Sequence, residues 1–263
     1  MSAVRLGHLT WKEAAQAAAA RTMVIVPTGA TEAHGPHLPL DTDAHQVTYV
    51  AERLAERVAA LVAPTVNYGY SETWMGFAGT MSLSQDVYQS MLTEICGSLL
   101  RHGFHDVMLL NGHRPQGTSN DAVARRVVDL YGTGRDFRIT AVSYWEPGAA
   151  RVHGMRKSPV GGMGHACELE TSFQLATRPE LVHMERLEGV RAPLVGWDLV
   201  APMEPSRTYE SWPTSAENHP AIFGAPSHAS AESGRAFLAA IIDSLVELVE
   251  HVRRGASAYG ERK

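Results

Sequence analysis

Acidic and imidazole side chains gather in three short stretches of the sequence. The first stretch, EAHGPHLPLDTDAH, covers residues 32–45, the second, NGH, covers 111–113, and the third, HACELETS, covers 165–172. Imidazole and carboxylate groups are the ligands that catalytic zinc, manganese and iron(II) sites use. The sequence therefore predicts a metal centre, and its candidate residues are Glu32, His34, His37, Asp41, Asp43, His45, His113, His165, Glu168 and Glu170.

The spacing within the first stretch favours a site for two ions. Glu32 and His34 are two positions apart in a segment that we expect to be extended, so their side chains point to the same side. Asp43 follows where a helix is expected to begin, and its two carboxylate oxygens could bridge two ions about 3.5 to 4 Å apart. A two-ion centre needs one shared carboxylate and several unshared ligands, and the three stretches together supply both.

Structural roles are open for the other groups of the first stretch, because His and Asp at loop ends often only cap helices. Asp41 or Thr42 could cap the helix that follows, while we expect His37 and His45 behind the ligands or facing a substrate. We expect Trp74, Trp145, Trp197 and Trp212 in the core or in a pocket wall, where their large apolar rings are best buried.

The elements around these stretches alternate between apolar runs and amphipathic segments. Apolar, β-branched runs predict strands at 22–29, 63–69, 106–113 and 137–145. Apolar residues at three- and four-residue spacing predict helices, and these cover 11–20, 42–62, 84–103, 120–132 and 229–254. Repeated strand–helix units indicate a three-layer α/β/α fold with a largely parallel central sheet. In such folds ligands bind at the carboxyl ends of the strands, where the first two stretches lie.

Residues 145–225 depart from this alternation, because Gly, Pro and Trp are scattered among short segments there. No low-complexity or Ser/Gly-rich run marks this part as a linker. We therefore expect loops that lie over the active face of a single domain covering residues 1–263. A chain of 263 residues is of ordinary length for one α/β domain.

Composition narrows the class of partner. The formal charge is −5, and no cluster of Lys and Arg is present, which argues against a nucleic-acid partner and favours a small molecule or a short peptide. No stretch approaches 18 uninterrupted apolar residues, so no membrane span is expected, and the first residues do not resemble a leader. The two cysteines, Cys96 and Cys167, do not form a CxxC pair, which fits a protein of the reducing cytoplasm.

The motifs EAHGPHLPLDTD, NGH and HACELETS resemble those of the creatininase (creatinine amidohydrolase) family. That family has a Glu-x-His-Gly-x-His-Leu-Pro loop followed by Asp, then Asn-Gly-His, then a His-Ala-Gly-Glu-x-Glu-Thr-Ser segment. Weaker similarity covers residues 68–83 and 223–238, so the resemblance accounts for nearly the whole chain. It implies a creatininase-like fold.

The resemblance also implies roles for particular residues. Glu32, His34, Asp43 and His113 would be metal ligands, with Asp43 bridging two divalent ions, zinc or manganese or both, with iron as a further possibility. Creatininase has its last ligand, a Glu, two positions after the Asn-Gly-His histidine, where this chain has Pro115. We expect Glu168 to replace that ligand and Glu170 to support it or to serve as the alternative. His165 would carry the proton to the leaving nitrogen, because imidazole titrates near neutral pH.

The implied activity is hydrolysis of a C–N amide bond by a metal-activated water, in a cyclic amide, a formamide or a similar small molecule. RPQGTSN replaces the usual Gly-Gly-Asn after His113, Trp74 stands where a His is frequent, and Ala78 replaces a common Pro, so the substrate itself is not fixed. A creatininase-like peptidase of the mycofactocin type and a metal-binding subunit without turnover are alternatives. A mononuclear iron(II) oxygenase is disfavoured by the surplus of carboxylates.

Self-association is a further implication of the resemblance, which indicates a homohexamer. Apolar and aromatic residues in the irregular part of the chain could line a subunit contact, for example Trp197, Trp212 and Phe223.

Overall fold

A parallel sheet forms the centre of the molecule. The computed structural model describes residues 4–196, 198–200 and 214–258. Within these residues five parallel strands pair in the order β1-β3-β2-β4-β5. Their bounds are β1 Val4–Arg5, β2 Val24–Thr28, β3 Leu61–Val62, β4 Asp106–Asn111 and β5 Arg138–Ser143. A separate antiparallel pair consists of β6 (Met163–His165) and β7 (Phe223–Gly224).

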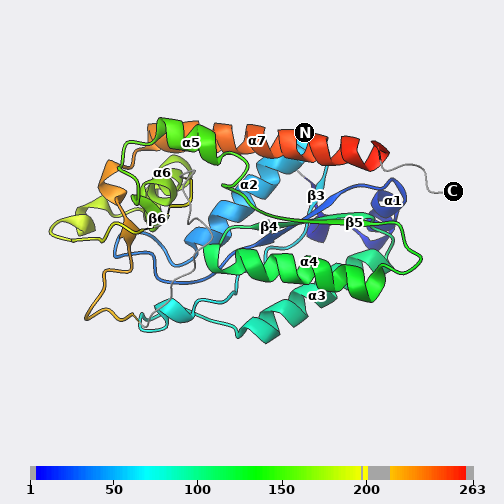
Figure 1. Cartoon of the computed structure of the whole chain (residues 1–263), viewed down its shortest axis with the longest axis horizontal. Coiled ribbons are helices and arrows are strands. Elements are labelled where there is room, and N and C mark those ends of the chain that lie inside the picture. The colour runs from blue at the N-terminus through cyan, green and yellow to red at the C-terminus, as the bar shows by residue number, and fades with distance from the viewer. Residues whose placement is uncertain (1–3, 197, 201–213, 259–263) are drawn as a thin grey trace.

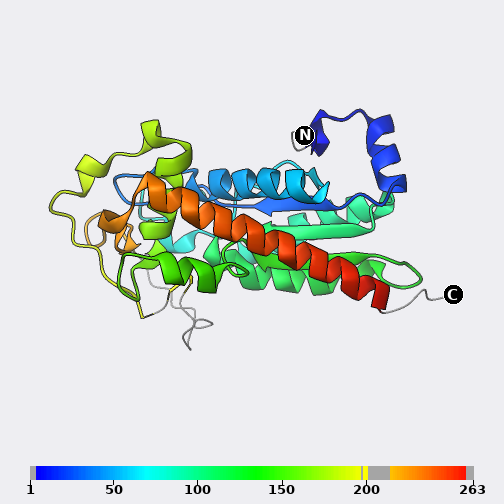
Figure 2. The same ribbon diagram turned by 90° about the horizontal axis from the view of Figure 1, so that it is seen from above.

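Helices cover both faces of the sheet (Figures 1 and 2). Helices α2 (Thr42–Val58) and α7 (Ala231–Ala258) lie along one face, and α3 (Gln85–Arg101) and α4 (Gly117–Tyr131) lie along the other. The shorter helices are α1 (Trp11–Ala19), α5 (Ala149–Met155) and α6 (Glu168–Thr177). The predicted three-layer α/β/α fold is confirmed. None of the helices in the described ranges is long and apolar enough to cross a membrane.

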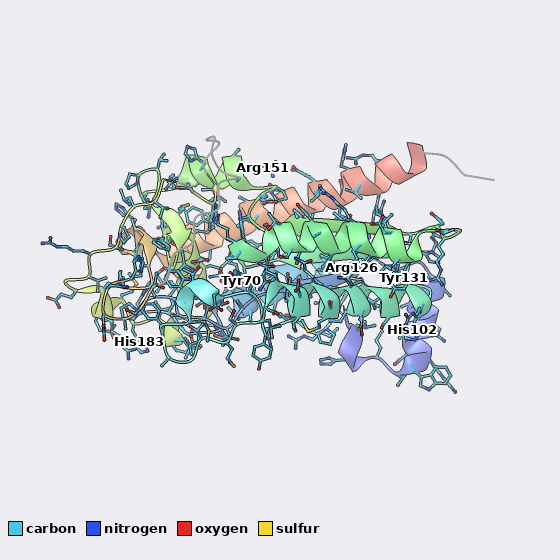
Figure 3. The ribbon with its side chains drawn as sticks, turned by 60° about the horizontal axis from the view of Figure 1, so that its bottom comes forward. Tyr70, His102, Arg126, Tyr131, Arg151 and His183 are labelled. Carbon is cyan, nitrogen blue, oxygen red and sulfur yellow. The ribbon has the colours of Figure 1, made fainter. Side chains whose placement is uncertain are left out.

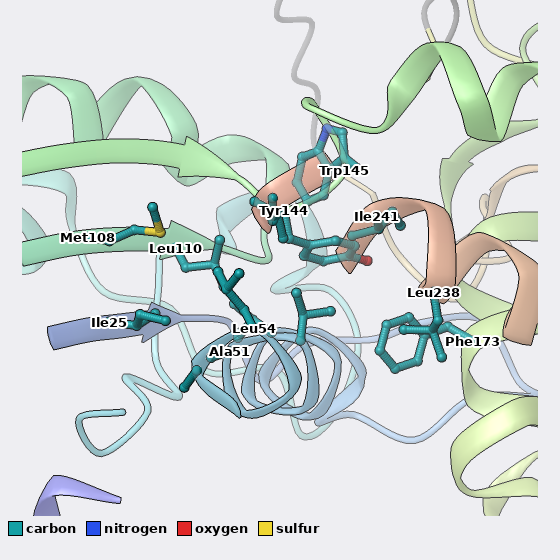
Figure 4. Close-up of a cluster of buried hydrophobic side chains, with 14 of the residues drawn as sticks. Ile25, Ala51, Leu54, Met108, Leu110, Tyr144, Trp145, Phe173, Leu238 and Ile241 are labelled. Carbon is teal, nitrogen blue, oxygen red and sulfur yellow. The ribbon is translucent and has the colours of Figure 1, made fainter. Parts of the chain in front are cut away.

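Strand alternation divides the core into two. In β4, Val107 and Leu109 pack toward α3 and α4, whereas Met108 and Leu110 pack toward α2 and α7. Successive side chains of a strand point to opposite faces, so a wholly buried strand is apolar at every position rather than at every second one. Figure 4 shows the core on the side of α2 and α7, where Leu110 lies near Leu54 of α2.

Two elements differ from the prediction. The prediction of a strand at 63–69 is wrong. The chain pairs at β3, just before that run, and the run itself forms isolated bridges, between Val66 and Thr28 and between Gly69 and Ser82. Pro64 contributes no amide hydrogen to a ladder, which ends regular pairing there. The irregular part at 145–225 also contains α6, a ten-residue helix whose first turn is wholly buried.

Two tryptophans singled out for a subunit contact, Trp197 and Trp212, lie outside the described residues. The third aromatic residue, Phe223, is buried within the chain itself at 6% exposure. Its ring lies 5.4 Å from that of Trp74. The described part of the chain therefore uses Phe223 for internal packing.

Candidate metal centre

The first stretch crosses the carboxyl edge of the sheet between β2 and α2. The loop is closed by a hydrogen bond from the Glu32 amide to the Leu40 carbonyl (2.9 Å), and the Ala33 amide donates to Thr80 Oγ1 (3.1 Å). Gly29 lets β2 approach the start of α2, because a Cβ there would lie 2.6 Å from Ala44 Cα. This close approach brings Asp43, in the first turn of α2, to the end of the strand.

The second stretch follows β4, the neighbour of β2 in the sheet. Asn111 ends β4, and its side-chain Oδ1 accepts the backbone amide of His113 (3.0 Å), which fixes the turn. Because β2 and β4 are parallel, their carboxyl ends meet at the same edge, and His113 comes to lie beside the first stretch. His113 Nδ1 is 2.9 Å from Asp43 Oδ2.

The third stretch turns sharply from β6 into α6. Ala166 has a φ of 49°, a left-handed conformation that is uncommon for residues other than Gly. Its amide donates to the carboxylate of Glu170, in the first turn of α6. The turn therefore presents His165 and Glu170 to the same side, toward the other two stretches.

These three stretches assemble three overlapping groups of buried ligand atoms. In each group, one side-chain atom per residue lies within 4.8 Å of the others. The groups are Glu32 with Asp43 and His113, His34 with Asp43 and Glu170, and Glu32 with His34 and His165. Asp43 belongs to two groups, as a carboxylate that bridges two ions must.

Backbone carbonyls orient the three imidazoles of these groups. His34 Nδ1 donates to the Glu32 carbonyl (3.2 Å), and His165 Nε2 donates to the Ala33 carbonyl (2.8 Å). His113 Nε2 donates to the carbonyl of Tyr70, which is labelled in Figure 3 (2.8 Å). The opposite nitrogens of His34 and His165 lie 3.0 Å from Asp43 Oδ1 and 3.5 Å from Glu32 Oε1. Metal-binding histidines are held in this way, with one nitrogen bonded to the protein and the other at the ion.

Several carboxylate oxygens of these groups lack hydrogen-bond partners. Both oxygens of Glu32 and Oδ2 of Asp43 are buried without a partner of good geometry among the described residues. Such burial is costly unless the charge is paired or bound to a metal.

Burial also changes the acidity of these groups. Desolvation raises the pKa of Glu32 and that of Glu170 each to about 7. For His34, burial opposes protonation, but the nearby carboxylates of Asp43, Glu170 and Glu32 together outweigh it and raise the pKa to about 10. These oxygens and nitrogens fit a pair of divalent cations.

Glu168 does not join the groups, contrary to the prediction that it supplies the last ligand. Its carboxylate accepts the amides of Lys157 (2.9 Å) and Ser158 (2.7 Å). The structure brings Glu170 to His34 and Asp43 instead. Both residues lie in the first turn of α6, and two helical residues separated by one other are rotated by about 200°, so only one of them can face the site.

The remaining polar residues of the first stretch bind other parts of the chain. Asp41 pairs with Arg178 through two contacts of 2.9 Å and makes no side-chain cap of α2. His37 Nε2 lies 2.9 Å from Thr171 Oγ1, and His45 Nε2 lies 3.0 Å from Thr177 Oγ1. His37 and His45 link the stretch to α6, and neither belongs to a ligand group or lines the cavity beside those groups.

A cavity of about 50 Å³ opens onto the ligand groups. Its walls include three aromatic rings, from Trp74, Trp145 and Phe223, which agrees with the expected place of the tryptophans. Trp74 stacks on His165, with ring centroids 4.4 Å apart and an interplanar angle of 17°. No pattern in the sequence predicts this stacking, although the replacement of a frequent His by Trp74 marks the position as unusual.

Arg114 and Pro115, immediately after His113, also line the cavity, although neither was predicted as a site residue. Two signals in the sequence mark this segment, its position next to a predicted ligand and the replacement of the usual Gly-Gly-Asn by RPQGTSN.

The chain is similar to known proteins over most of its length. A profile of the creatininase family, described as creatinine amidohydrolase, matches residues 7–249. A creatinine amidohydrolase of Pseudomonas putida is 34% identical over 78% of this chain and 84% of its own. A mycofactocin precursor peptide peptidase of Mycobacterium ulcerans is 31% identical over 93% of this chain and 91% of its own.

Solved structures give the same result. A Zn–Zn form of a mutant creatininase superimposes with a TM-score of 0.77 at 29% identity, over 95% of this chain and 98% of its own. A manganese form superimposes with a TM-score of 0.78 at 28% identity, with the same coverage.

Proposed function

The chain belongs to the creatininase family, and we propose that it is a metal-dependent hydrolase that cleaves a C–N amide bond in a small molecule. The observation that carries this proposal is the sharing of Asp43 between two buried ligand groups. One group would hold the first ion with Glu32, Asp43 and His113. The other would hold the second ion with His34, Asp43 and Glu170, which takes the place that we first gave to Glu168.

Zinc, manganese or one ion of each fits this centre. The donors are imidazole nitrogens and carboxylate oxygens, which suit both metals. Related creatininases have been solved in Zn–Zn and manganese forms. When bound, such ions lower the pKa of a coordinated water toward about 7 and polarise a carbonyl oxygen.

His165 is placed to move the proton. Its Nε2 is committed to the Ala33 carbonyl, so Nδ1 is the atom that faces the ligand groups. Burial, reinforced by the charge of His34, holds the pKa of His165 well below its usual range. The neutral ring can accept a proton at Nδ1 and return it to the leaving nitrogen, while the stacked ring of Trp74 restricts its rotation.

Elemental analysis of the purified protein tests the proposal. We expect close to two transition ions per chain and loss of amide hydrolysis on chelation, with recovery when zinc or manganese is restored. Fewer than one ion per chain, with no activation by either metal, would refute it.

Cleavage of a short peptide is the second candidate. It is favoured by the coverage of the peptidase relative and by a larger groove, of about 850 Å³, that shares Arg114, Pro115, Trp145 and Leu199 with the metal cavity. A panel of lactams, formamides and dipeptides assayed with metal-loaded protein separates the two candidates. Retention of two ions with no turnover of any of the three classes would indicate a metal-binding subunit.

We also propose a homohexamer, which rests on the resemblance to creatininase. Sedimentation of a single species near the monomer mass of 28.6 kDa would refute it.

A further inference from the structure

Helix α6, which carries Glu170, is not fixed by the central sheet. Within the described residues, the strand before it, β6, pairs with β7 alone, in a sheet separate from the five parallel strands. By contrast, Asp43 and His113 lie just after β2 and β4, which pair with each other in the central sheet. The position of Glu170 relative to the other ligands therefore depends on contacts that α6 itself makes.

Gln46 makes one of these contacts directly to Glu170. It lies one turn after Asp43 on α2 and is fully buried. Its Nε2 donates to the backbone carbonyl of Glu170 (3.0 Å), and its Oε1 accepts the hydroxyl of Tyr144 (2.7 Å). A carbonyl oxygen can only accept a hydrogen bond, so the amide must present its nitrogen to Glu170 and its oxygen to Tyr144. The two partners thus fix the orientation of the amide.

Tyr144 joins this amide to the central sheet. It follows β5 directly, and its backbone amide donates to the Asn111 carbonyl at the end of β4 (2.9 Å). Its ring, labelled in Figure 4, is buried, and its centroid lies 6.3 Å from that of Phe173 on α6. The hydroxyl therefore reaches Gln46 from a residue whose backbone is held by the sheet.

Glu170 is consequently held at both ends. Its carboxylate accepts the Ala166 amide, and its backbone carbonyl accepts the Gln46 side chain. Other side-chain hydrogen bonds also join the first stretch to α6, in the pairs His37 with Thr171, Asp41 with Arg178, Thr42 with Gln174 and His45 with Thr177. None of these four pairs includes a residue of the ligand groups, so the bond of Gln46 differs from them in ending on a ligand residue.

We propose that Gln46, held by Tyr144, is a positioning residue that keeps Glu170 at the second ion and so sets the affinity of that ion. The inference rests on the two-ion centre of the proposed function and gives a role in it to a residue outside the ligand groups. The ligands of the first ion include no residue of α6. Loss of Gln46 should therefore weaken the binding of one ion and spare the other.

Competition with a chromophoric zinc chelator tests the proposal, because it measures a dissociation constant for each ion. We expect Gln46→Met, which keeps the length of the side chain without its amide, to weaken one ion by on the order of 10- to 100-fold and to leave the other unchanged. Tyr144→Phe keeps the bond from Gln46 to Glu170 and should weaken the same ion by less. In the His34→Ala background, which should retain the first ion alone, neither replacement should change the affinity that remains.

Tyr88→Phe is the matched control. Tyr88 is fully buried in the core on the opposite face of the sheet, and its hydroxyl donates to Asn120 Oδ1 at the same distance, 2.7 Å. Asn120 Nδ2 in turn donates to Thr28 Oγ1 (3.0 Å) rather than to a ligand residue. Tyr88→Phe thus removes an equivalent buried hydrogen bond, and both ions should bind as tightly as in the wild type.

Three results would overturn the proposal: equal weakening of both ions in Gln46→Met, unchanged affinity of both, or the same effect in Tyr88→Phe as in Tyr144→Phe. If Gln46→Met does not fold, the comparison of the two Tyr→Phe variants decides alone.

The proposed function fails in a different way, because metal affinity is measured without turnover. Selective weakening of one ion in a protein that cleaves no amide would refute the hydrolase and keep the role of Gln46. Amide hydrolysis by a two-ion protein whose affinities do not change in Gln46→Met would refute the role of Gln46 alone. A wild type that binds fewer than one ion would refute both.

Discussion

Two clusters of buried carboxylates differ in how their oxygens are satisfied. In the cluster of Glu168 and Asp198, the chain supplies the partners: Glu168 accepts two backbone amides, and Asp198 accepts the amides of Gly161 (2.9 Å) and Val200 (3.1 Å). In the ligand cluster, both oxygens of Glu32 and one of Asp43 have no such partner.

This difference separates carboxylates that stabilise the fold through backbone hydrogen bonds from carboxylates whose oxygens are available to a metal ion. Burial alone does not distinguish them, because Glu32 and Glu168 are both fully buried. A buried carboxylate whose two oxygens each accept a backbone amide has fewer lone pairs left for a metal ion than one whose oxygens have no partner. The oxygens without partners, together with the nearby imidazoles, therefore mark the ligand cluster.

Replacement of Asp43 by Asn is the strongest test of the ligand cluster. The change keeps the size of the side chain but removes the charge from the residue shared by both groups, so both ions should be lost. We expect metal content near zero and a fall in activity of on the order of 100-fold or more, since the loss of even an outer partner of a metal ligand costs about 10- to 100-fold. Metal analysis and steady-state kinetics measure both quantities.

The His34→Ala variant should lose only one of the two ions, because His34 does not belong to the group of Glu32, Asp43 and His113. It should keep about half of the metal. Equal metal content in the Asp43→Asn variant and the wild type would show that Asp43 does not bridge.

Glu168→Ala and Glu170→Ala test the two clusters against each other. Loss of the Glu168 carboxylate leaves the amides of Lys157 and Ser158 without their acceptor, so we expect the unfolding free energy to fall by roughly 2 to 5 kcal/mol while the metal is retained. Glu170→Ala should lose one ion with a smaller loss of stability in the metal-free state. Urea unfolding and metal analysis of both variants decide, and the opposite result would restore Glu168 as the ligand.

Removal of the metal should lower the stability of every variant whose ligand cluster still binds ions. Ions that bind only the folded chain stabilise it by about 2.7 kcal/mol at a free concentration one hundred times Kd. We expect chelation to lower the Tm of the wild type and of Glu168→Ala by similar amounts. Asp43→Asn should show almost no shift, and a full shift in that variant would place the bound metal elsewhere.

His37 sharpens the comparison, because its Nδ1 is buried without a partner yet belongs to no ligand group. Burial, reinforced by the charge of His34, lowers the pKa of His37 to about 4. The unfolded chain takes up this proton near pH 6.5 and the folded chain only near pH 4, so stability is lost as the pH falls between these values. The loss between pH 7 and pH 5 should be about 2 kcal/mol.

The His37→Gln variant isolates this contribution. Its unfolding free energy should depend less on pH than that of the wild type, by that amount, when both are measured by urea unfolding at pH 7 and pH 5. Equal pH dependence in the two proteins would contradict a neutral, buried His37.

The sequence predicts most of the fold because its signals are local. The amphipathic spacing of α2 and the apolar run of β4 each reveal an element within a short window. The strand β3 was missed because only Leu61 and Val62 pair, and the sequence attaches them to the preceding helix. Such a short strand exists only through its neighbours in the sheet.

The site was predicted in part. Glu32, His34, Asp43 and His113 come together as the motifs indicated. The choice between Glu168 and Glu170 depends on where α6 begins, because a shift of two residues in a helix turns a side chain to the opposite face. The stacking of Trp74 on His165 is a contact between distant segments, which no local pattern encodes.

The position of Asp43 in two ligand groups has a consequence for the lifetime of the fold. Ions bound there would join segments from residue 32 to residue 170, and so act as a reversible cross-link across more than half of the chain. Closing a long loop costs entropy that grows only slowly with its length, so such a cross-link removes much of the freedom of the opened chain. Unfolding must then release the ions first, and the metal would slow proteolysis of the protein as well as support its chemistry.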